Sequence, residues 1–594
     1  MNIICFDTEV FKYDWLFYAK DLTNDKDYCF WNDREAFADF YTEHRNDLWL
    51  GYNVRGYDQY IVKGLLCGLN PYKISQHIIK HGQPGWSFSS AFKKVSLNFY
   101  DIMTSRNMGG LKTLEGFMGM DIEETQVDFN LDRPLNDNER ELTIKYCKHD
   151  VDSACEVLNK TMNMFSAHIA VIKEFGRPLR DMCNTQAQLA AKILGATPSI
   201  FNDDYDIRMP DTLQLTKYRE VVDWFTNAYN DTITCMLERG ENPDDSELFA
   251  KRFYGRSLEI DVAGVPHVFG WGGVHGAITQ YVHTCSDDEV LLMADVNQLY
   301  PSLMVEYNIL SRAVEHPERF RSILDTSLKL KAEGKKKERE PYKLINNISY
   351  GASGDKYNPM FDPLHRNLVC VFGQVLLLDL IEKIEPFCKL IQSNTDGVLL
   401  LVKKKDLDTI KSIISDWEKR TRLKMSYDEY VRVMQGDVNN YLVVDHNGKY
   451  KSKGAYVKEL TPLDYDLPIV NKAVKEYLVN GTHPRETIMN CNMLMEFQKI
   501  YKVSSKYEYA VWRDEKLKGK VFRVFASTDP YDTIIGKTKG EGMTVEKFAL
   551  SPDHCFIWNR NILGVEVPKN LDKEYYVQLA ISRITDKFGV EVTE

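Results

Sequence analysis

The feature of this sequence that most constrains its fold is a pair of aspartates, each placed at the end of a short apolar run. Asp295 follows the run VLLM at residues 290–293, and Asp396 lies in a polar break between residues 390–391 and 398–401. Short apolar runs of this kind are typical of buried strands, and two runs separated by polar residues and a glycine predict a β-hairpin. Each carboxylate is therefore expected at a strand end or hairpin tip, facing a ligand. Two such carboxylates predict a site for paired divalent cations, which suit in-line phosphoryl transfer.

Three motifs surround these aspartates in a fixed order. They are ADVNQLYPS at residues 294–302, KLINNISYG at residues 343–351 and SNTDG at residues 393–397. They resemble the motifs D-x-x-x-L-Y-P-S, K-x-x-x-N-x-x-Y-G and Asp-Thr-Asp of family B DNA polymerases. The third departs from that pattern, because Asn394 stands in place of the first aspartate. Two ordinary buried strands and a lysine-rich helix are the alternative, but three motifs in order favour the polymerase.

The N-terminus carries a second set of carboxylates. Residues 2–6 predict a strand that leads into Asp7 and Glu9, and residues two apart in a strand point to the same face. Two further acids follow, and the set resembles the four-carboxylate site of a 3′–5′ proofreading exonuclease. Tyr146, four residues before the last acid and on the same predicted helical face, matches the tyrosine of that family. The four carboxylates are Asp7, Glu9, Asp58 and Asp150.

Two basic side chains near these acids, Lys112 and His149, do not match a residue of the exonuclease motif. Lys112 is expected to be a solvated helix lysine, with orientation of a phosphate as the alternative. His149 has the wrong offset for the histidine variety of the exonuclease family, so we expect it at the surface or as a capping side chain. Like charges packed as closely as the four acids need cations to neutralise them.

The resemblance implies a multidomain chain of the α/β and α+β classes. An RNase H-like exonuclease domain would precede a right-hand polymerase with palm, fingers and thumb. The expected segments are the exonuclease at 1–165, a helical connector at 166–255, a first palm segment at 256–310, fingers at 311–372, a second palm segment at 373–462 and thumb at 463–594.

The resemblance also implies the activity, a DNA-directed DNA polymerase that adds dNTPs to a primer 3′ end and proofreads with its exonuclease. Two Mg²⁺ ions per active site would serve as cofactors, and Mn²⁺ could substitute. Asp295, Asp396 and the backbone carbonyl of Val296 would bind the polymerase ions, and the four N-terminal carboxylates the exonuclease ions. Tyr146 would orient the attacking water of the exonuclease.

Cations and aromatic side chains are expected around the nucleotide. Lys343 is the first candidate for the triphosphate. Lys331, expected about three helical turns earlier on a similar face, is the second. Tyr300 would lie under the sugar and exclude a 2′-hydroxyl. The expected nucleotide-binding residues are Tyr300, Lys331, Asn347, Tyr350 and Gly351.

Four residues are expected to contact DNA. Gly272 and Gly273 resemble the Gly-Gly element of this family that touches the template strand, since adjacent glycines let backbone amides approach a phosphate. Tyr441 and Lys453 resemble the K-x-Y and K-x-K-G elements that grip the primer strand. The lysine of the first element is absent, because Asn439 stands in its place.

Composition is consistent with this interpretation but does not establish it. The 594 residues leave room for several domains, and a net charge of −11 argues against indiscriminate coating of nucleic acid. The twelve cysteines form no C-x-x-C pair, so neither a zinc site nor a disulfide framework is indicated. The start of the chain does not resemble a signal peptide, and no run is long and apolar enough to span a membrane.

The expected setting follows from these observations. We expect a monomer in the cytoplasm, or in the host cytoplasm if the chain is phage-encoded. Its expected partners are primer-template DNA, dNTPs and replication accessory proteins, without a membrane. The gaps at 296–342 and 352–393 leave little space for the two insertions of protein-primed polymerases. A compact, phage-like enzyme that replicates a phage genome from an ordinary nucleic-acid primer is therefore favoured.

Two other functions remain open. One is a stand-alone 3′–5′ exonuclease with a catalytically inactive polymerase-like half that binds DNA. The other is a non-catalytic clamp or scaffold, against which the six carboxylates in the motifs argue. A primer-extension assay separates the first alternative from the polymerase.

Overall fold

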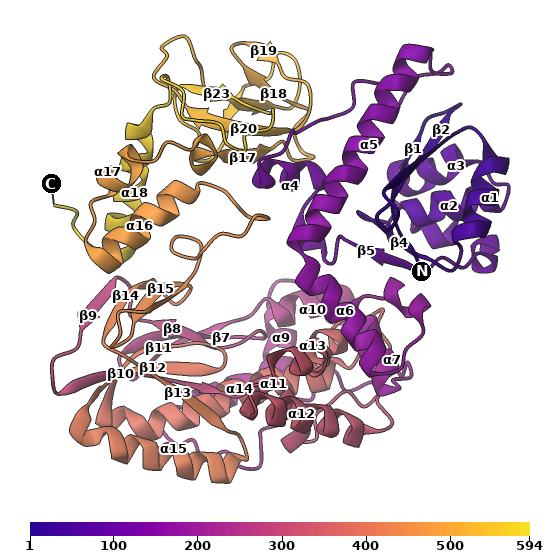
Figure 1. Cartoon of the computed structure of the whole chain (residues 1–594). Helices are drawn as coiled ribbons and strands as arrows, with labels where there is room; N and C mark the ends of the chain where they lie inside the picture. The colour runs from indigo at the N-terminus through magenta and orange to yellow at the C-terminus, as the bar shows by residue number, and fades with distance from the viewer. Residues whose placement is uncertain (594) are drawn as a thin grey trace. The chain divides into compact units, whose positions relative to one another are not determined.

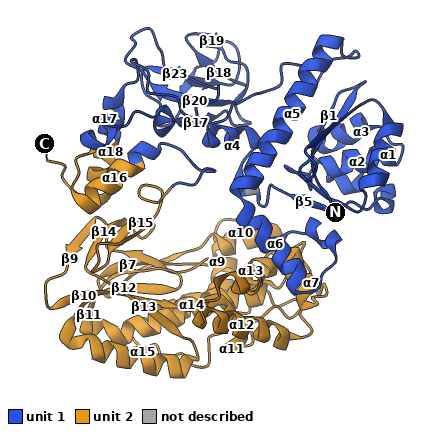
Figure 2. Ribbon diagram, viewed as in Figure 1, with its two compact units in different colours: residues 1–185, 460–470, 485–579 blue, residues 186–459, 471–484, 580–594 orange. Residues whose placement is uncertain are grey.

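The chain folds into two compact units, neither of which is continuous in sequence. The computed structural model describes residues 1–593 (Figure 1). Unit 1 consists of Met1–Thr185, Leu460–Val470 and Arg485–Leu579, and unit 2 of Gln186–Glu459, Asn471–Pro484 and Ala580–Glu594 (Figure 2). Both units mix helices with several sheets, so the expectation of a multidomain α and β chain is confirmed at this level. The six expected segments divide the chain more finely and stay a prediction.

Unit 1 is built on a five-stranded sheet with the strand order β3-β2-β1-β4-β5. β1 pairs antiparallel with β2 and parallel with β4. β1 is longer than the predicted strand, because its pairing with β2 continues to Val10. Asp7 and Glu9 therefore lie inside the strand rather than after it. The strands are β1 (Ile3–Val10), β2 (Trp15–Asp21), β3 (Lys26–Trp31), β4 (Leu48–Gly51) and β5 (Phe99–Asp101).

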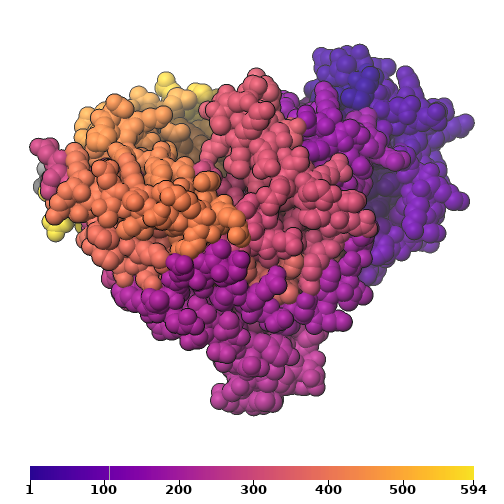
Figure 3. Space-filling model, turned by 90° about the horizontal axis from the view of Figure 1, so that it is seen from below, coloured from indigo at the N-terminus to yellow at the C-terminus, as the bar shows by residue number. Residues whose placement is uncertain are grey.

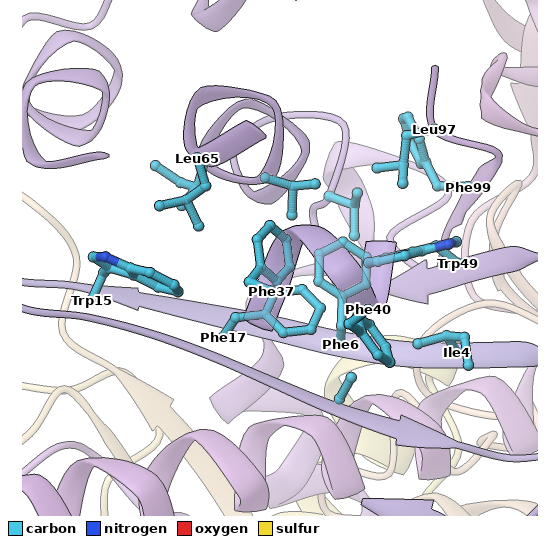
Figure 4. Close-up of a cluster of buried hydrophobic side chains, with 14 of the residues drawn as sticks. Ile4, Phe6, Trp15, Phe17, Phe37, Phe40, Trp49, Leu65, Leu97 and Phe99 are labelled. Carbon is cyan, nitrogen blue, oxygen red and sulfur yellow. The ribbon is translucent and has the colours of Figure 1, made fainter. Parts of the chain in front are cut away.

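One face of this sheet packs on an aromatic core. Phe6 and Phe17 extend from neighbouring strands toward Phe37 and Trp49 (Figure 4). The ring centroids of Phe6 and Trp49 lie 5.4 Å apart, edge to face, and those of Phe17 and Phe37 lie 4.7 Å apart. Because side chains alternate along a strand, burial of Phe6 on this face turns Asp7 and Glu9 to the other. That face packs against helix α5 (Asp137–Lys160).

Further helices complete the N-terminal portion of unit 1. Side chains of α1 and α2 complete the aromatic core. The helices are α1 (Arg34–His44), α2 (Asp58–Leu66), α3 (Pro71–Ser75), η1 (Gln76–Lys80), η2 (Gly85–Ser87), η3 (Ser90–Lys94), η4 (Arg106–Met108), α4 (Leu111–Met118), α6 (Met162–Glu174) and η5 (Leu179–Cys183).

The C-terminal portion of unit 1 contains two small sheets, ordered β17-β20-β23 and β19-β18-β21-β22. Strands β17 and β20 pack against α4, so residues far apart in sequence share one unit. The elements are α17 (Pro484–Met489), η8 (Leu494–Phe497), β17 (Lys499–Lys502), β18 (Tyr509–Trp512), β19 (Glu515–Lys516), β20 (Val521–Ala526), β21 (Gly536–Thr538), β22 (Glu546–Lys547) and β23 (Cys555–Ile557). Two further helices, α16 (Pro468–Asn480) and α18 (Lys573–Phe588), run from one unit into the other.

Unit 2 is built on a seven-stranded sheet with the order β13-β10-β12-β11-β8-β7-β6 and a four-stranded sheet with the order β16-β15-β14-β9. The predicted hairpin is present, because β11 and β12 pair antiparallel. The strands are β6 (Leu258–Val262), β7 (Val265–Phe269), β8 (His275–Ala277), β9 (Tyr281–Thr284), β10 (Glu289–Val296), β11 (Cys388–Ser393), β12 (Gly397–Lys403), β13 (Met425–Tyr430), β14 (Arg432–Asp437), β15 (Asn440–Val444) and β16 (Tyr450–Lys453).

The helices of unit 2 include one that is buried along nearly its whole length. α14 is predominantly apolar and buried on nearly all sides, as expected of a helix enclosed by other elements. The helices are α7 (Gln186–Leu194), α8 (Arg219–Thr226), α9 (Ala228–Glu238), α10 (Ser246–Tyr254), α11 (Leu299–Glu306), α12 (Pro317–Ala332), α13 (Lys336–Ser353), α14 (Pro363–Ile384), η6 (Glu385–Phe387), η7 (Lys404–Asp406) and α15 (Leu407–Thr421). Across residues 1–593, no helix has the length and apolar character needed to cross a membrane.

Helices α12 and α13 pack against each other as a hairpin. The chain reverses at Gly334, whose φ of +71° is readily reached only without a Cβ atom. Lys331 and Lys343 therefore lie on separate helices, and the expectation that they share one helical face is wrong. The rose-coloured atoms of this segment form a portion of the surface seen in Figure 3.

Candidate active sites

The first candidate site is a pocket of about 580 Å³ in unit 1. β1 contributes Asp7 and Glu9, α2 contributes its first residue Asp58, and α5 contributes Asp150. The structure thus brings together the four carboxylates singled out in the sequence. Thr8 fixes one of them, because its hydroxyl donates to Asp58 Oδ1 at 2.6 Å.

Burial, with a contribution from neighbouring carboxylates, raises the pKa values of all four acids. Burial raises the pKa of Asp7 and of Glu9 well above their ordinary range, and the neighbouring carboxylates add to the effect. Burial likewise raises the pKa of Asp58 to about 7 and that of Asp150 to about 6. Nearby positive charge would favour the ionised forms. A set of carboxylate oxygens that destabilise one another in this way fits a hard divalent cation such as Mg²⁺ or Mn²⁺.

The ligand atoms also lie close enough together for a metal. One carboxylate oxygen each of Asp7 and Glu9 lies within 4.8 Å of the other and of Cys147 Sγ. The Cys147 thiol contacts Asp7 Oδ2 at 3.7 Å, and burial raises the pKa of that thiol well above its ordinary value. The raised pKa favours a neutral thiol at Cys147, so the carboxylate oxygens are the better candidate metal ligands in this group.

Lys112 is a member of this site rather than a solvated helix lysine, so that expectation is wrong. Its ammonium pairs with Asp150 and, at 3.1 Å, with Glu115 Oε1. It also lies 4.6 Å from the ring centroid of Tyr146. Burial lowers the pKa of Lys112, but the two carboxylates outweigh this and raise it overall. Lys112 thus supplies positive charge to the carboxylate cluster.

Tyr146 lies on α5 beside Asp150 and remains protonated. Burial raises the pKa of its phenol, and the charges of Asp150, Glu9 and Asp7 raise it further. A neutral phenol can donate a hydrogen bond to a water molecule or a phosphate oxygen.

His149 neither caps a helix nor lies free on the surface, contrary to the sequence expectation. Its side chain is only 17% exposed, and Nε2 lies 3.3 Å from Glu115 Oε1. Burial lowers the pKa of His149, but the hydrogen bond and the charge of Glu115 raise it more. The net effect is a raised pKa. Glu115 therefore joins Lys112 and His149 in a buried cluster next to Asp150.

The second candidate site lies in unit 2, where β10 meets the β11–β12 turn. Asp295 lies opposite Gly397 in the β10–β12 ladder, and the Val296 N–H donates to the Asp396 carbonyl at 2.7 Å. A Cβ at position 397 would lie 1.9 Å from Asp295 Oδ1, so this close approach requires glycine. The two motif aspartates thus come from adjoining backbone segments.

The pKa of Asp295 depends on a further acid, Asp428, and on two lysines. Burial raises its pKa to about 6, and the charges of Asp396 and Asp428 contribute, while Lys451 and Lys453 oppose the shift. Asp428 pairs with Met293 in the β10–β13 ladder, so it lies on the same face of the sheet as Asp295. Lys451 Nζ pairs with Asp428 Oδ2 at 2.8 Å.

Asn394 shapes the turn that carries Asp396. Its side-chain oxygen accepts the backbone N–H of Asp396 at 3.2 Å and that of Gly397 at 2.9 Å. This is the local hydrogen bonding that asparagine and aspartate both provide in turns. The departure from the Asp-Thr-Asp pattern therefore preserves the turn while it removes a charge.

The two predicted triphosphate lysines differ in where they lie. Lys331 donates to Asn297 Oδ1, two residues beyond Asp295 in the first motif. Lys343 is 43% exposed, and its Nζ lies 3.8 Å from Glu340 Oε1. Among residues 1–593, no contact joins Lys343 to either motif aspartate. The structure thus brings Lys331, the second candidate, to the first motif.

Aromatic and glycine residues of the motifs meet beside these aspartates. The ring centroids of Tyr300 and Tyr350 lie 4.4 Å apart, and the Tyr300 hydroxyl donates to the Gly272 carbonyl at 2.9 Å. A Cβ at Gly273 would lie 2.7 Å from the Thr395 hydroxyl, next to Asp396. Asn347 and Gly351 are exposed on α13.

Tyr441 and Lys453 face each other in the β15–β16 ladder. The Lys453 ammonium lies 5.9 Å from the Tyr441 ring centroid. Burial raises the pKa of Tyr441, and the charge of Asp295 adds to the shift. Both residues therefore lie near the second site, and their contact with DNA stays a prediction.

The comparisons with known proteins leave the family open. The sequence matches no protein-family model and no curated protein sequence. Among solved structures, it is similar to the family B DNA polymerase from the hyperthermophilic archaeon Pyrobaculum calidifontis. The TM-score is 0.41 and the identity 14%, over 100% of this chain and 79% of that chain. A likeness at this level decides neither family nor activity, so the function rests on the residues of the two sites.

Several residues of the two sites carried little signal in the sequence. Glu115 was detectable, because its spacing of three from Lys112 predicts a pair on one helical face. Asp101 accepts the N–H groups of Asn53 and Arg55 at 2.9 Å each and so fixes the loop before Asp58. Asp428 lies in a strand of mixed polarity. Neither aspartate belongs to a motif, so only the folded chain identifies them.

Proposed function

We propose that this chain is a family B-type DNA polymerase that adds dNTPs to a primer 3′ end and carries a 3′–5′ proofreading exonuclease. The convergence of Asp295 and Asp396 is the observation that carries the proposal. Asp295 lies in β10 and Asp396 in the β11–β12 turn, within different motifs, yet the N–H of Val296, the residue after Asp295, donates to the Asp396 carbonyl at 2.7 Å. Two carboxylates held this way support a cation site for phosphoryl transfer.

Asp295, Asp396 and the Val296 carbonyl would hold two Mg²⁺ ions, or Mn²⁺ in their place. When bound, these ions would activate the primer 3′-hydroxyl and neutralise charge on the dNTP triphosphate. Lys331 and Lys343 would add fixed positive charge at the triphosphate. Tyr300 would occupy the space of a ribose 2′-hydroxyl. The proposed base-pair lining is Asn347, Tyr350 and Gly351, and the proposed DNA contacts are Gly272, Gly273, Tyr441 and Lys453.

The pocket of unit 1 supports the exonuclease half of the proposal. Asp7, Glu9, Asp58 and Asp150 would hold the cations of that site, which supply a Lewis acid for phosphodiester hydrolysis. Tyr146 would orient the attacking water through its neutral hydroxyl. Lys112 holds Asp150 in place through its ion pair. Two sites that test one product provide the selectivity that binding alone cannot supply.

The biological setting belongs to the same proposal. We propose replication of a phage genome by a monomer in the host cytoplasm, from an ordinary nucleic-acid primer. Primer-template DNA, dNTPs and replication accessory proteins would be its partners.

A second candidate function is a stand-alone 3′–5′ exonuclease with an inactive polymerase-like half that binds DNA. Three observations favour it. Asn394 brings no charge to the hairpin, and Lys343 makes no contact with the motif aspartates among the described residues. Four carboxylates are gathered in unit 1, whereas only two from the sequence motifs are gathered in unit 2.

Extension of a primed template, with and without Mg²⁺ and with a matched or mismatched primer end, separates the two functions. A polymerase with proofreading extends the matched primer and removes the mismatch first. Asp396→Asn should abolish extension, whereas Asp408→Asn, an exposed aspartate on α15, should not. A folded wild-type protein that degrades DNA but never extends a primer with Mg²⁺ or Mn²⁺ would exclude the polymerase and leave the exonuclease.

A further inference from the structure

The candidate nuclease pocket contains a residue from the far end of the chain. Lys502, the last residue of β17, lines the pocket together with Asp7, Glu9, Asp58 and Asp150. It belongs to the C-terminal portion of unit 1, separated in sequence from the N-terminal layer by most of unit 2. No sequence motif places a C-terminal lysine beside these acids.

Arg523 fixes the C-terminal portion of unit 1 to α4. Its side chain is fully buried, and it donates to the carbonyl oxygens of Gly116 at 3.0 Å and Met120 at 2.8 Å. It also donates to the Arg560 carbonyl at 2.7 Å in its own region of the chain. One guanidinium thus joins the end of α4 to the C-terminal sheet, with the directional geometry of an arginine fork.

Backbone hydrogen bonds and apolar packing reinforce this junction. Ile122 N–H donates to the Asn559 carbonyl at 2.7 Å, and Ile562 N–H donates to the Gly119 carbonyl at 2.9 Å. Ile500 packs against Gly116, where an added Cβ would lie 3.0 Å from Ile500 Cδ1. The position of β17 on α4 is therefore fixed by several independent contacts.

The strand geometry of β17 then determines where Lys502 points. Ile500 and Lys502 are two residues apart in one strand, so their side chains extend from the same face. Because Ile500 packs on Gly116 in α4, Lys502 extends toward the beginning of that helix. Its Nζ lies 3.8 Å from the position that a Cβ on Gly110 would occupy. Gly110 and Lys502 both line the carboxylate pocket.

The charges in the pocket leave Lys502 available to a ligand. The ammonium of Lys112 is already paired with Asp150 and Glu115. Lys502 is exposed, and its ammonium forms no ion pair with any residue in the range 1–593. A nucleic-acid strand that enters a pocket of four carboxylates needs cations outside the metal ligands to attract its phosphates.

We propose that Lys502 binds a backbone phosphate of the strand whose 3′ end enters this pocket. The nuclease site is then built from both ends of the chain, with Arg523 as the positioning residue that sets β17 on α4. This inference rests on the proposed exonuclease function. It adds a strand-binding residue from the C-terminal segment, which the N-terminal motifs do not contain.

The test uses the full chain, a single-stranded oligonucleotide and Mg²⁺. Lys502→Ala should raise the KM for 3′–5′ degradation roughly 3- to 10-fold and leave kcat nearly unchanged. It should also reduce the salt dependence of log KM by about 0.7, the value for one phosphate contact on a single strand. Lys502→Arg should restore both quantities. Lys518→Ala, an exposed lysine of the same segment outside the pocket, is the matched control.

Binding of the same oligonucleotide in EDTA, followed by fluorescence anisotropy, gives a second measure that requires no catalysis. Lys502→Ala should weaken binding by a similar factor. Unchanged KM, salt dependence and anisotropy in a folded Lys502→Ala protein would overturn the inference, while Asp7-dependent degradation would leave the proposed function standing. Wild-type protein without Asp7-dependent degradation would overturn both.

Discussion

At the β11–β12 turn, a single amide maintains the geometry that a carboxylate would otherwise provide. The Asn394 oxygen accepts two backbone N–H groups, so its structural role needs an acceptor but no charge. Asn394→Asp should therefore leave primer extension and Tm close to those of the wild type. Asn394→Ala removes the acceptor and should lower both, with about 1 kcal/mol of stability lost. Extension assays and thermal melts of both variants test this, and loss of extension in Asn394→Asp would contradict it.

Tyr300 combines two interactions that substitutions can separate. Its ring contacts Tyr350, and its hydroxyl donates to the Gly272 carbonyl. If the ring excludes a 2′-hydroxyl, Tyr300→Ala should increase ribonucleotide use relative to deoxyribonucleotide use. Tyr300→Phe keeps the ring and should preserve discrimination, although it loses the hydrogen bond. Incorporation ratios from competing nucleotides measure both, and an unchanged ratio in Tyr300→Ala would remove this role.

The carboxylate cluster of unit 1 predicts how stability depends on pH. Burial raises the pKa of Asp58 to about 7 in the folded state, against about 4 in the unfolded chain. The folded protein therefore holds this proton more tightly, and the free energy of unfolding falls as pH rises between these two values. In EDTA at about pH 8, Asp58→Asn should raise Tm by a few degrees, because it removes the buried charge.

The difference in Tm between Asp58→Asn and the wild type should shrink toward about pH 5, where the Asp58 carboxyl of the wild type is largely protonated. Added Mg²⁺ should raise Tm more in the wild type than in Asp58→Asn, because the variant lacks one ligand. Thermal melts across this range test the prediction, with Asp408→Asn as the control at an exposed position. Equal pH dependence in wild type and Asp58→Asn would contradict it.

At the scale of single elements, α4 depends on a contact from the distant strand β20. Arg523 donates to five carbonyl oxygens, of Glu115, Gly116, Met120, Trp558 and Arg560. Arg523→Ala removes the donor of all five hydrogen bonds and should lower the free energy of unfolding by about 3 kcal/mol. Amide hydrogen exchange in α4 should become faster, because the carbonyls at its C-terminal end lose their hydrogen bonds to Arg523.

Chemical denaturation and hydrogen exchange measure these two effects. Lys520→Ala, an exposed side chain next to β20, serves as the control. If α4 retains its wild-type protection in Arg523→Ala, Arg523 does not position that helix.

The elements that could be predicted from sequence were those with a strong local signal. β10, β11 and β12 are apolar runs bounded by polar residues, so their existence and the β11–β12 hairpin followed from pattern alone, whereas the antiparallel pairing of β10 with β12 was not predicted. β1 is longer than its apolar run, because Asp7 and Glu9 alternate with buried neighbours and extend its ladder. The break at Gly334 was missed, since the lysine-rich stretch has helical spacing on both sides and only the positive φ of one glycine stops it.

At the scale of the whole molecule, the discontinuity of unit 1 had no sequence signature. An arginine such as Arg523 is usually exposed, and nothing local indicates that it binds carbonyls of α4. The four carboxylates could be grouped from their motifs, whereas Lys502 could not, because its place depends on how β17 packs. Local patterns therefore predicted the motif acids of both sites, whereas Asp101, Asp428 and Lys502 depended on long-range packing.

The division into two units also predicts that the two proposed activities are separable. The acids of the first site lie in unit 1, and Asp295 and Asp396 lie in unit 2. Asp7→Ala combined with Glu9→Ala should abolish 3′–5′ degradation, because it removes two metal ligands, while primer extension continues. Asp396→Asn should have the reverse effect. Each loss should exceed about 100-fold, since removal of a metal ligand reduces activity at least as strongly as removal of its supporting partners.

Thermal melts must first establish that each variant is folded, because the acids of unit 1 are buried and their replacement alters stability. Degradation of a single strand and extension of a matched primer are then measured on the same preparations. A terminally mismatched primer adds a third measurement, since its extension needs the nuclease to act before the polymerase. In the Asp7→Ala, Glu9→Ala variant, extension from the mismatch should fall while extension from the matched end persists. Loss of matched extension in that folded variant would mean that the acids of unit 1 also serve the polymerase reaction, and the assignment of one activity to each unit would be wrong.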